Sequence, residues 1–520
     1  MATEVPQFDV HDVAFEGPTV RAGDSPATDV TLGTTWRHES GTVHELAGFF
    51  DGDGSGEPSG NVFCVRFTPT KPGEWRLIRT ASNVPALAGA REGLTITCVE
   101  SDHPGFWEVD TESPDRRWYR RSDGSHPYLV GNTHYSFLSE HDADGPHDSD
   151  VATDVAANAA YFDKLRCSIT ADRYPDPDCK PFLDDRGEQT DDGEWSHRPN
   201  PAWFRDRVDA AVRAAVAEDL VIDLILNGPD TEESRSVLAG PDPTPLLDYV
   251  AARYGSFPNV WFCLSNEWDI KTPQFEPTAM VTAGRYLRDR LPHSTPVSTH
   301  ASPQVWPTSL ETYPPWNDHA IVQDKLKTLG EAADVTRASH RTADRKPVVN
   351  DELAYQGAGD GWSHEDVIEA FLGAFLGGGY ASTGYKPGEK VTQYFWGAFD
   401  PDEHTAAEHL RWLANVIETD LTFFRMEPTA IDESPFATLA QNGTVRSGCR
   451  VLAWPNREYV LGTNRRHADV VVHLPPGRWD VDRYDVIAME TTTVAEDREA
   501  RVTVNTPNSR AGMTVCTLRS

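Results

Sequence analysis

Several features are scarce or missing in this sequence of 520 residues. Only nine of its 47 basic residues are lysines, and they stand against 81 acidic residues, which gives a formal net charge of −34. An acidic surface repels nucleic acid and anionic membranes, so neither is expected as a partner. Two explanations of the charge stay open, an acidic protein that binds ligands or stores metal and a halophilic protein adapted to high salt. The scarcity of lysine favours the second.

Long apolar runs and paired cysteines are also missing. No stretch reaches the roughly 18 apolar residues that a membrane helix needs. The start, "MATEVPQFDV", has neither the basic residues nor the apolar run of a signal peptide, which predicts a cytoplasmic protein. The seven cysteines are scattered without CxxC spacing, which predicts reduced core residues and no zinc site. Nothing in the sequence indicates an oligomeric state.

Two binding motifs are absent as well. No GxGxxG fingerprint follows a predicted strand, so a dinucleotide-binding sheet is not expected. The stretch "DGDGSGE" (51–57) begins like a calcium loop, but its twelfth position is Val62 instead of a bidentate glutamate. A tight turn between strands is therefore expected at this place, and neither a metal nor a cofactor is expected in the protein.

Three regions differ in pattern, which predicts a multidomain protein. Residues 1–102 and 429–520 contain short alternating runs separated by turns, as is typical of β-sandwiches. Residues 103–428 contain strand-length apolar runs followed by helical stretches such as 201–220 and 276–291, which predict a central (β/α)8 TIM barrel. The expected barrel strands include the runs 127–138, 220–228, 260–269, 296–302, 320–323 and 347–357. For the eighth strand two runs compete, 392–399 and 377–384.

Two glutamates end predicted strands of this barrel. The run "VWFCLSNEWD" (260–269) delivers Glu267, and "KPVVNDE" (346–352) delivers Glu352. If the run 127–138 is the first strand, these are the fourth and the seventh, and their C-terminal ends point into the active site. Two carboxyls across a barrel mouth suit glycoside hydrolysis, in which one attacks the anomeric carbon and the other protonates the leaving oxygen. Retaining enzymes hold the pair roughly 5–5.5 Å apart.

The motifs "SNEWD" and "NDELAY" together resemble those of the clan A (β/α)8 retaining glycoside hydrolases. The N-terminal "GFFDGDG…VRFTPTKPGEWRLIRTAS" is similar to the β-sandwich domain that precedes such barrels in a poorly characterised group of bacterial and archaeal glycosidases. The resemblance implies that Glu267 is the acid/base, that Glu352 is the nucleophile and that Asn266 donates to the sugar 2-hydroxyl.

Further polar and aromatic side chains near the strand ends are candidates for sugar binding. Each polar group could equally satisfy a buried backbone group. The candidates are His134, Tyr135, Asn227, His300 and Gln323, of which Gln323 is the weakest. Arg166 is expected either to fix the nucleophile or to form a surface salt bridge. Among Trp268, Trp306, Trp316 and Trp396, the last is our choice for stacking on a sugar, because it lies near one of the two runs that compete for the eighth strand.

The leading hypothesis is thus a retaining O-glycoside hydrolase that acts on an oligo- or polysaccharide. A non-catalytic carbohydrate-binding protein on the same scaffold is the alternative. A barrel enzyme that uses these acids on a metal would show clustered ligands at the strand ends, whereas the histidines there are scattered.

Overall fold

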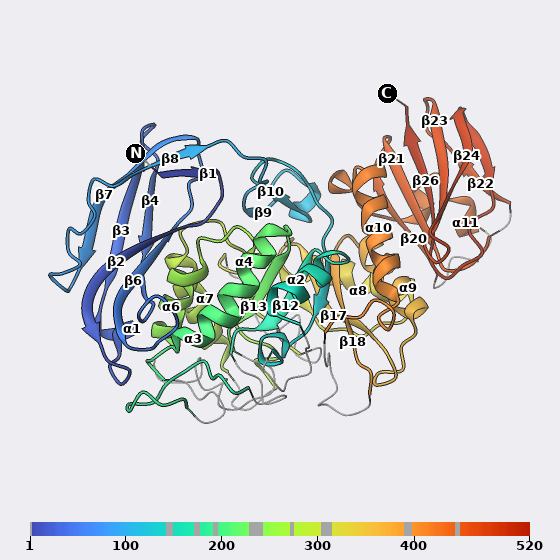
Figure 1. Ribbon diagram of the computed structural model, residues 1–520. Coiled ribbons are helices and arrows are strands. Elements are labelled where there is room, and N and C mark those ends of the chain that lie inside the picture. The colour runs from blue at the N-terminus through green and yellow to red at the C-terminus, as the bar shows by residue number, and fades with distance from the viewer. Residues whose placement is uncertain are drawn as a thin grey trace.

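The structure is a computed structural model, and it describes residues 3–141, 149–170, 177–190, 196–227, 243–270, 275–302, 315–388, 398–441, 448–467 and 469–519. Figure 1 shows three parts: a β-rich N-terminal part in blue, a central barrel in green to orange and a β-rich C-terminal part in red. The multidomain architecture expected from the sequence is confirmed.

The N-terminal part is a sandwich of a five-stranded sheet, in the order β1-β8-β7-β3-β4, and a three-stranded sheet, β2-β6-β5. Its pairs are antiparallel apart from β1 and β8, which run parallel. Every second residue faces the core, so that in β7 Trp75 and Leu77 are buried between exposed neighbours. The elements are β1 (Thr3–Pro6), β2 (His11–Val20), α1 (Pro26–Asp29), β3 (Leu32–His38), β4 (Val43–Ala47), β5 (Phe49–Phe50), β6 (Gly60–Phe67), β7 (Gly73–Ser82) and β8 (Thr95–Val99).

The stretch 51–57 connects β5 to β6, as the turn interpretation predicts. The Asp53 carboxylate accepts hydrogen bonds from the backbone N–H groups of Ser55 and Glu57, which closes the turn on itself. Asp51 faces the barrel and contacts Arg253 at 2.9 Å.

Eight parallel strands form the barrel, in the order β15-β14-β13-β12-β11-β18-β17-β16. The described residues show no pairing between β15 and β16, so the ring is nearly closed. A hairpin of β9 (Trp107–Val109) and β10 (Tyr119–Arg121) leads into it. The barrel strands are β11 (Val130–Thr133), β12 (Lys164–Ser168), β13 (Val221–Ile225), β14 (Val260–Cys263), β15 (Val297–Ser298), β16 (Ala320–Val322), β17 (Val348–Gln356) and β18 (Tyr380–Tyr385).

Helices follow most of these strands and cover the outside of the barrel (Figure 1). Their apolar sides pack on the strands, while strand residues are buried on both faces, as a parallel sheet requires. The helices are α2 (Val151–Ala159), α3 (Pro201–Trp203), a π-helical turn (Phe204–Asp209), α4 (Ala210–Ala217), α6 (Thr244–Tyr254), α7 (Pro277–Arg290), α8 (Leu329–Thr342), α9 (His364–Leu376) and α10 (Ala406–Asp420).

The eighth strand is β18, so the glycine-rich alternative of the two competing runs is confirmed. Glycines precede this strand because the chain comes very close to its neighbours there. A Cβ atom on Gly379 would lie 2.6 Å from the Thr336 methyl and 2.9 Å from the Val348 carbonyl oxygen. The competing run falls mostly outside the described residues.

The C-terminal part contains a six-stranded antiparallel sheet, β19-β20-β21-β26-β23-β24, and a small second sheet of β22 and β25. The six-stranded sheet packs on α8 and α9 through β20 and β21. The elements are β19 (Glu427–Thr429), α11 (Thr438–Gln441), β20 (Cys449–Trp454), β21 (Glu458–Thr463), β22 (Val470–His473), β23 (Trp479–Asp485), β24 (Glu490–Arg498), β25 (Arg501–Val504) and β26 (Gly512–Leu518).

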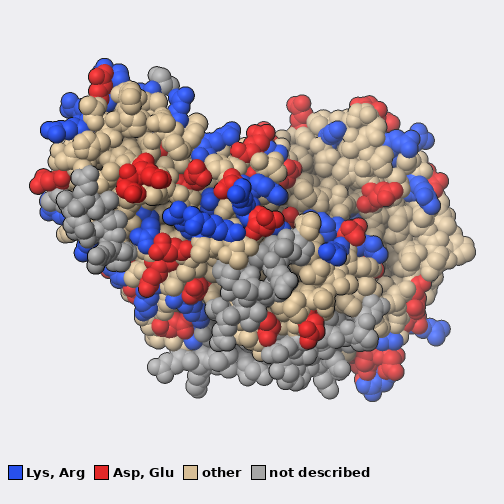
Figure 2. All heavy atoms as spheres, turned by 180° about the vertical axis from the view of Figure 1, so that it is seen from behind, with Lys and Arg blue, Asp and Glu red and all other residues tan. Residues whose placement is uncertain are grey.

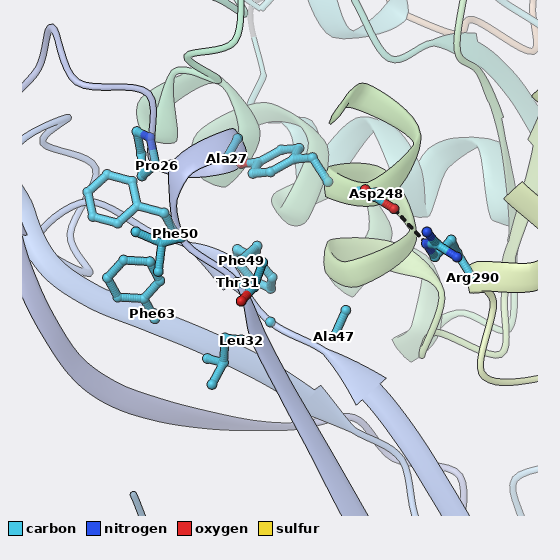
Figure 3. Close-up of a pocket in the computed structure, with 13 residues that line it drawn as sticks. Pro26, Ala27, Thr31, Leu32, Ala47, Phe49, Phe50, Phe63, Asp248 and Arg290 are labelled. Carbon is cyan, nitrogen blue, oxygen red and sulfur yellow. Dashed lines mark hydrogen bonds and ion pairs between the residues drawn. The ribbon is translucent and has the colours of Figure 1, made fainter. Parts of the chain in front are cut away.

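A cavity of about 220 Å³ lies where the N-terminal sandwich meets α6 and α7 (Figure 3). Phe49, Phe50 and Phe63 line it from the sandwich, and the ion pair of Asp248 and Arg290 lies on the barrel side. This cavity belongs to the contact between the two domains, and neither Glu267 nor Glu352 lines it.

The surface is less uniform than the net charge suggests. On the face in Figure 2, Lys and Arg side chains gather in a band across the middle, with acidic side chains scattered around it. No helix within the described ranges combines the length and the apolar character needed to cross a membrane. Of the seven free cysteines, all except Cys179 are buried.

Candidate active site

Glu267 and Glu352 both lie at the carboxyl end of the barrel, but neither lies directly at a strand end. Strand β14 ends at Cys263, and Glu267 follows four residues later in a turn. Strand β17 continues past Glu352 to Gln356. Our expectation that each glutamate is the last residue of its strand is therefore wrong, although both strands carry their glutamate toward the same mouth.

One amide joins the two carboxylates. The Gln323 Nε2 atom lies 2.7 Å from Glu267 Oε1 and 3.0 Å from Glu352 Oε2. These two oxygens are therefore separated by no more than the sum of the two distances. Gln323 comes directly after β16, so the fourth, sixth and seventh strands of the barrel meet at this point.

The Tyr135 hydroxyl approaches the nucleophile candidate from the first strand. It donates a short hydrogen bond to Glu352 Oε1, while Gln323 takes the other oxygen. Burial and the charge of Glu352 raise the pKa of Tyr135 well above its ordinary value, so this hydroxyl keeps its proton and remains a donor. Both oxygens of Glu352 are thus fixed by donors.

The surroundings of Glu352 act on its pKa in both directions. Burial raises the pKa of the Glu352 carboxyl, and the neighbouring charge of Glu267 raises this pKa further. The Lys325 ammonium, the Tyr135 hydroxyl and the Arg166 guanidinium oppose the rise in pKa, but the net shift is upward.

The backbone at Glu267 is in the left-handed region, with φ of 45°. This conformation costs a residue with a side chain roughly 1–3 kcal/mol and persists only when its surroundings impose it. The neighbouring amides supply that constraint, since the Trp268 N–H donates to the His300 carbonyl and the His300 N–H donates to the Ser265 carbonyl. These two backbone hydrogen bonds join the turn after β14 to the turn after β15.

Strand β17 has a register shift between Asn350 and Ala354. In a regular strand neighbouring side chains point to opposite faces. Here Asp351 contacts Lys164 and Ser382 inside the barrel, while the next residue, Glu352, reaches Tyr135 and Gln323. The irregularity therefore lets two consecutive acids face the barrel interior, in keeping with the frequent position of bulges beside active sites.

Asn266 is held by Arg166 and His300. Its Oδ1 atom accepts from Arg166 Nη2 at 3.0 Å and lies 2.6 Å from His300 Nδ1. Because a guanidinium only donates, the amide oxygen must face Arg166, which turns Nδ2 to the other side. Arg166 is fully buried, so the surface salt bridge is excluded. Its Nη2 atom contacts Asn266, His300 and Cys263, and none of its described hydrogen bonds goes to the nucleophile candidate.

A layer of buried charges lies around this arginine. Lys164, Arg166, Asp223 and Asp351 are all fully buried. The Lys164 ammonium lies 3.1 Å from Asp223 Oδ2 and donates a shorter bond to Asp351. Burial raises the pKa of Asp223 despite Lys164, whereas Lys164 and Arg166 overcome burial and lower the pKa of Asp351.

The other predicted sugar-binding residues either contact neighbouring protein groups or lie outside the described residues. His134 contacts Glu140 at 3.1 Å, and Asn227 donates to Ser265 Oγ at 3.0 Å. Both are buried, which supports structural roles beneath the mouth. Trp268 and Trp316 are packed in the core. Trp396 and Trp306 lie outside the described residues.

Gln323, the weakest of the predicted candidates, and Tyr135, which had no specific predicted role, both contact Glu352. The only available signal was position, since each follows a short apolar run directly. The described residues contain no group of three His, Cys, Asp or Glu side chains that could hold a metal ion.

Comparisons with known proteins agree with this architecture. Residues 4–81 match a domain of unknown function, DUF5060, and residues 114–385 match the family described as "Apiosidase-like, catalytic domain". Among curated proteins no relative matches the chain.

Two solved structures from Bacteroides vulgatus share the fold. A candidate glycoside hydrolase has a TM-score of 0.74 at 20% identity, with 99% of this chain and 100% of that chain covered. A glycoside hydrolase of family 5 has a TM-score of 0.58 at 12% identity, with 80% and 93% covered. The matched family domain, which contains both Glu267 and Glu352, spans more than half of the sequence, and the chain therefore belongs to the Apiosidase-like family.

Proposed function

We propose that this protein is a retaining O-glycoside hydrolase in which Glu352 is the nucleophile and Glu267 is the acid/base. One observation carries the proposal: a single amide nitrogen contacts both carboxylates at the mouth of the barrel. The separation that this contact allows is compatible with the roughly 5–5.5 Å of retaining enzymes, and inverting enzymes hold their carboxyls roughly 6.5–9.5 Å apart. The family and the fold support glycosidase activity in general.

The roles follow from the neighbours of each carboxylate. Glu352 is the more deeply buried of the two, and Tyr135 and Gln323 hold both of its oxygens, which suits a group that attacks from a fixed position. Glu267 is partly exposed in a turn, which suits a group that exchanges protons with a leaving group and then with water. Asn266 precedes it and would donate to the sugar through Nδ2.

The direct test is a screen of aryl glycosides, with an aryl apioside first because of the family name, and of oligosaccharides, at low and at high salt. The acidic composition motivates the high-salt arm. The Glu352→Ala protein is the blank, because no other group can form the covalent intermediate. If the wild type hydrolyses no substrate faster than this variant does, the non-catalytic carbohydrate-binding alternative is favoured.

Azide separates the roles of the two glutamates. In Glu267→Ala a nitrophenolate leaves without protonation, and azide then attacks the intermediate without needing a base, so a glycosyl azide of retained configuration is expected. In Glu352→Ala azide enters from the side of the missing nucleophile, which inverts the configuration. NMR of the anomeric proton reads the outcome, and exchanged configurations would reverse the assignment.

A further inference from the structure

Gln323 makes an unusual set of contacts for a partly buried glutamine. Its single amide nitrogen has two hydrogens and two carboxylate neighbours, Glu267 and Glu352. Ionised carboxylates only accept hydrogen bonds, so the nitrogen and not the oxygen faces them. One hydrogen can therefore go to each glutamate.

The oxygen of the same amide has no partner among the described residues. Gln323 Oε1 is a buried atom that accepts no hydrogen bond from them. An unsatisfied buried acceptor is unfavourable, so such an atom at an active site calls for a donor that arrives with a ligand. Sugar hydroxyls are such donors.

A second glutamine of the barrel, Gln356, shows the ordinary arrangement. Gln356 Nε2 donates to the Glu403 carbonyl and to Thr405 Oγ1, and its Oε1 accepts from the Ala406 N–H at 2.8 Å. Both ends of this amide are satisfied by protein groups. Of these two glutamines, the one with an open acceptor is the one that lies between Glu267 and Glu352.

We propose that Gln323 is a catalytic and substrate-reading residue, whose Nε2 donates to both glutamates while Oε1 accepts a hydrogen bond from a hydroxyl of the sugar bound between them. This inference rests on the proposed glycosidase function and names the hydroxyl-bearing ring at the cleavage point as the group that is recognised.

The bridging amide has a consequence in the empty protein. A donor to the charged form of a carboxylate lowers its pKa, and an amide between two carboxylates also screens their repulsion. Removing the amide should therefore raise the pKa of Glu352 further, so that this carboxyl keeps its proton to higher pH.

The first test needs no substrate. The infrared band of the protonated carboxyl that disappears in Glu352→Gln is titrated in wild type, in Gln323→Met and in the matched control Gln356→Met. Gln323→Met should move the midpoint up by about one pH unit, and Gln356→Met should leave it unchanged. A midpoint that is the same in all three proteins overturns the bridging role.

The second test uses the best glycoside of the screen. Gln323→Met should raise KM through the lost acceptor and lower kcat through the altered proton state, with a combined loss in kcat/KM of about 100-fold or more. Gln323→Glu keeps an acceptor, so its KM should rise less while its kcat falls. Unchanged KM in Gln323→Met would overturn the substrate-reading role.

The two tests separate the two proposals. If the wild type cleaves no glycoside, the proposed function fails, while the infrared midpoint still decides whether Gln323 couples the glutamates. If glycosides are cleaved and the midpoint does not move, the function stands and the bridging role fails.

Discussion

Two clusters of buried charge in this molecule have similar composition and opposite character. At the contact between the N-terminal sandwich and the barrel, Asp209 receives hydrogen bonds from both Arg66 and Arg253. These guanidiniums overcome the effect of burial and hold the pKa of Asp209 well below its ordinary value. In the barrel mouth, burial and Glu267 raise the pKa of Glu352 instead. Buried charge alone therefore does not identify an active site.

The degree of hydrogen-bond satisfaction differs in the same way. Around Asp209, all three nitrogens of Arg253 donate, two of them to Asp209 and the third to Asp51 and Tyr249. One nitrogen of this cluster, Arg66 Nε, has no hydrogen bond in the described part of the chain, although it lies 3.4 Å from Asp12 Oδ1. In the barrel, two nitrogens of Arg166 and one oxygen each of Asp223 and Asp351 are buried without hydrogen-bond partners among the described residues. The more fully satisfied cluster joins two domains, while the less satisfied one lies beside the two glutamates of the barrel mouth.

The largest expected effect comes from the barrel mouth. Glu352→Gln removes the nucleophile but preserves the size of the side chain, so kcat on an activated aryl glycoside should fall by about 10⁴-fold or more. Urea unfolding should show little loss of stability, because the repulsion from Glu267 disappears as well. If Glu352→Gln and Asp209→Asn lost the same fraction of kcat, the distinction between the two clusters would be removed.

Substitution in the cluster around Asp209 should have the opposite effect, with a loss of stability and an unchanged kcat. Asp209→Asn leaves Arg66 and Arg253 with an uncompensated buried charge, and we expect a loss of about 3–5 kcal/mol in the free energy of unfolding. The value of kcat for the folded fraction should be unchanged, because Asp209 touches no group at the mouth. Urea titration and active-site-normalised kinetics measure the two quantities.

The pH dependence of stability tests the cluster around Asp209 further. Because the pKa of Asp209 is depressed in the folded protein, its stabilising contribution is present above the unfolded pKa of about 3.9 and is lost as the pH falls through the folded value. The stability difference between wild type and Asp209→Asn should therefore be constant between pH 5 and 7 and narrow below about pH 4. A difference that widens in acid would contradict the assignment.

The smallest expected effect concerns the left-handed backbone at Glu267. Glu267→Gly removes the strain and one of two repelling carboxylates, so the free energy of unfolding should rise by up to about 1 kcal/mol while hydrolysis of unactivated substrates is lost. Glu267→Gln removes only the charge, so its free energy of unfolding should rise by less. If the glycine variant is the less stable of the two in urea, the strain is not real.

The sequence predicted the barrel well because its strands are buried on both faces and appear as continuous apolar runs. It did not decide the eighth strand, because the tight fit of Gly379 against Thr336 and Val348 depends on residues far away in the chain. Position along the strands located both glutamates. The orientation of Arg166 toward Asn266 and the bridging role of Gln323 depend on the distances between strands, which no local pattern contains.

The register shift in β17 also bears on how this protein can evolve. Asp351 and Glu352 face the interior together only because the strand accommodates an irregularity between Asn350 and Ala354. Deleting one residue in this segment would restore the regular alternation and turn one of the two acids toward the helices, although every other residue type would be kept. Descendants of this sequence should therefore tolerate substitutions near Glu352 more readily than changes in length, and a changed number of residues within β17 would mark loss of activity even where both acids are kept.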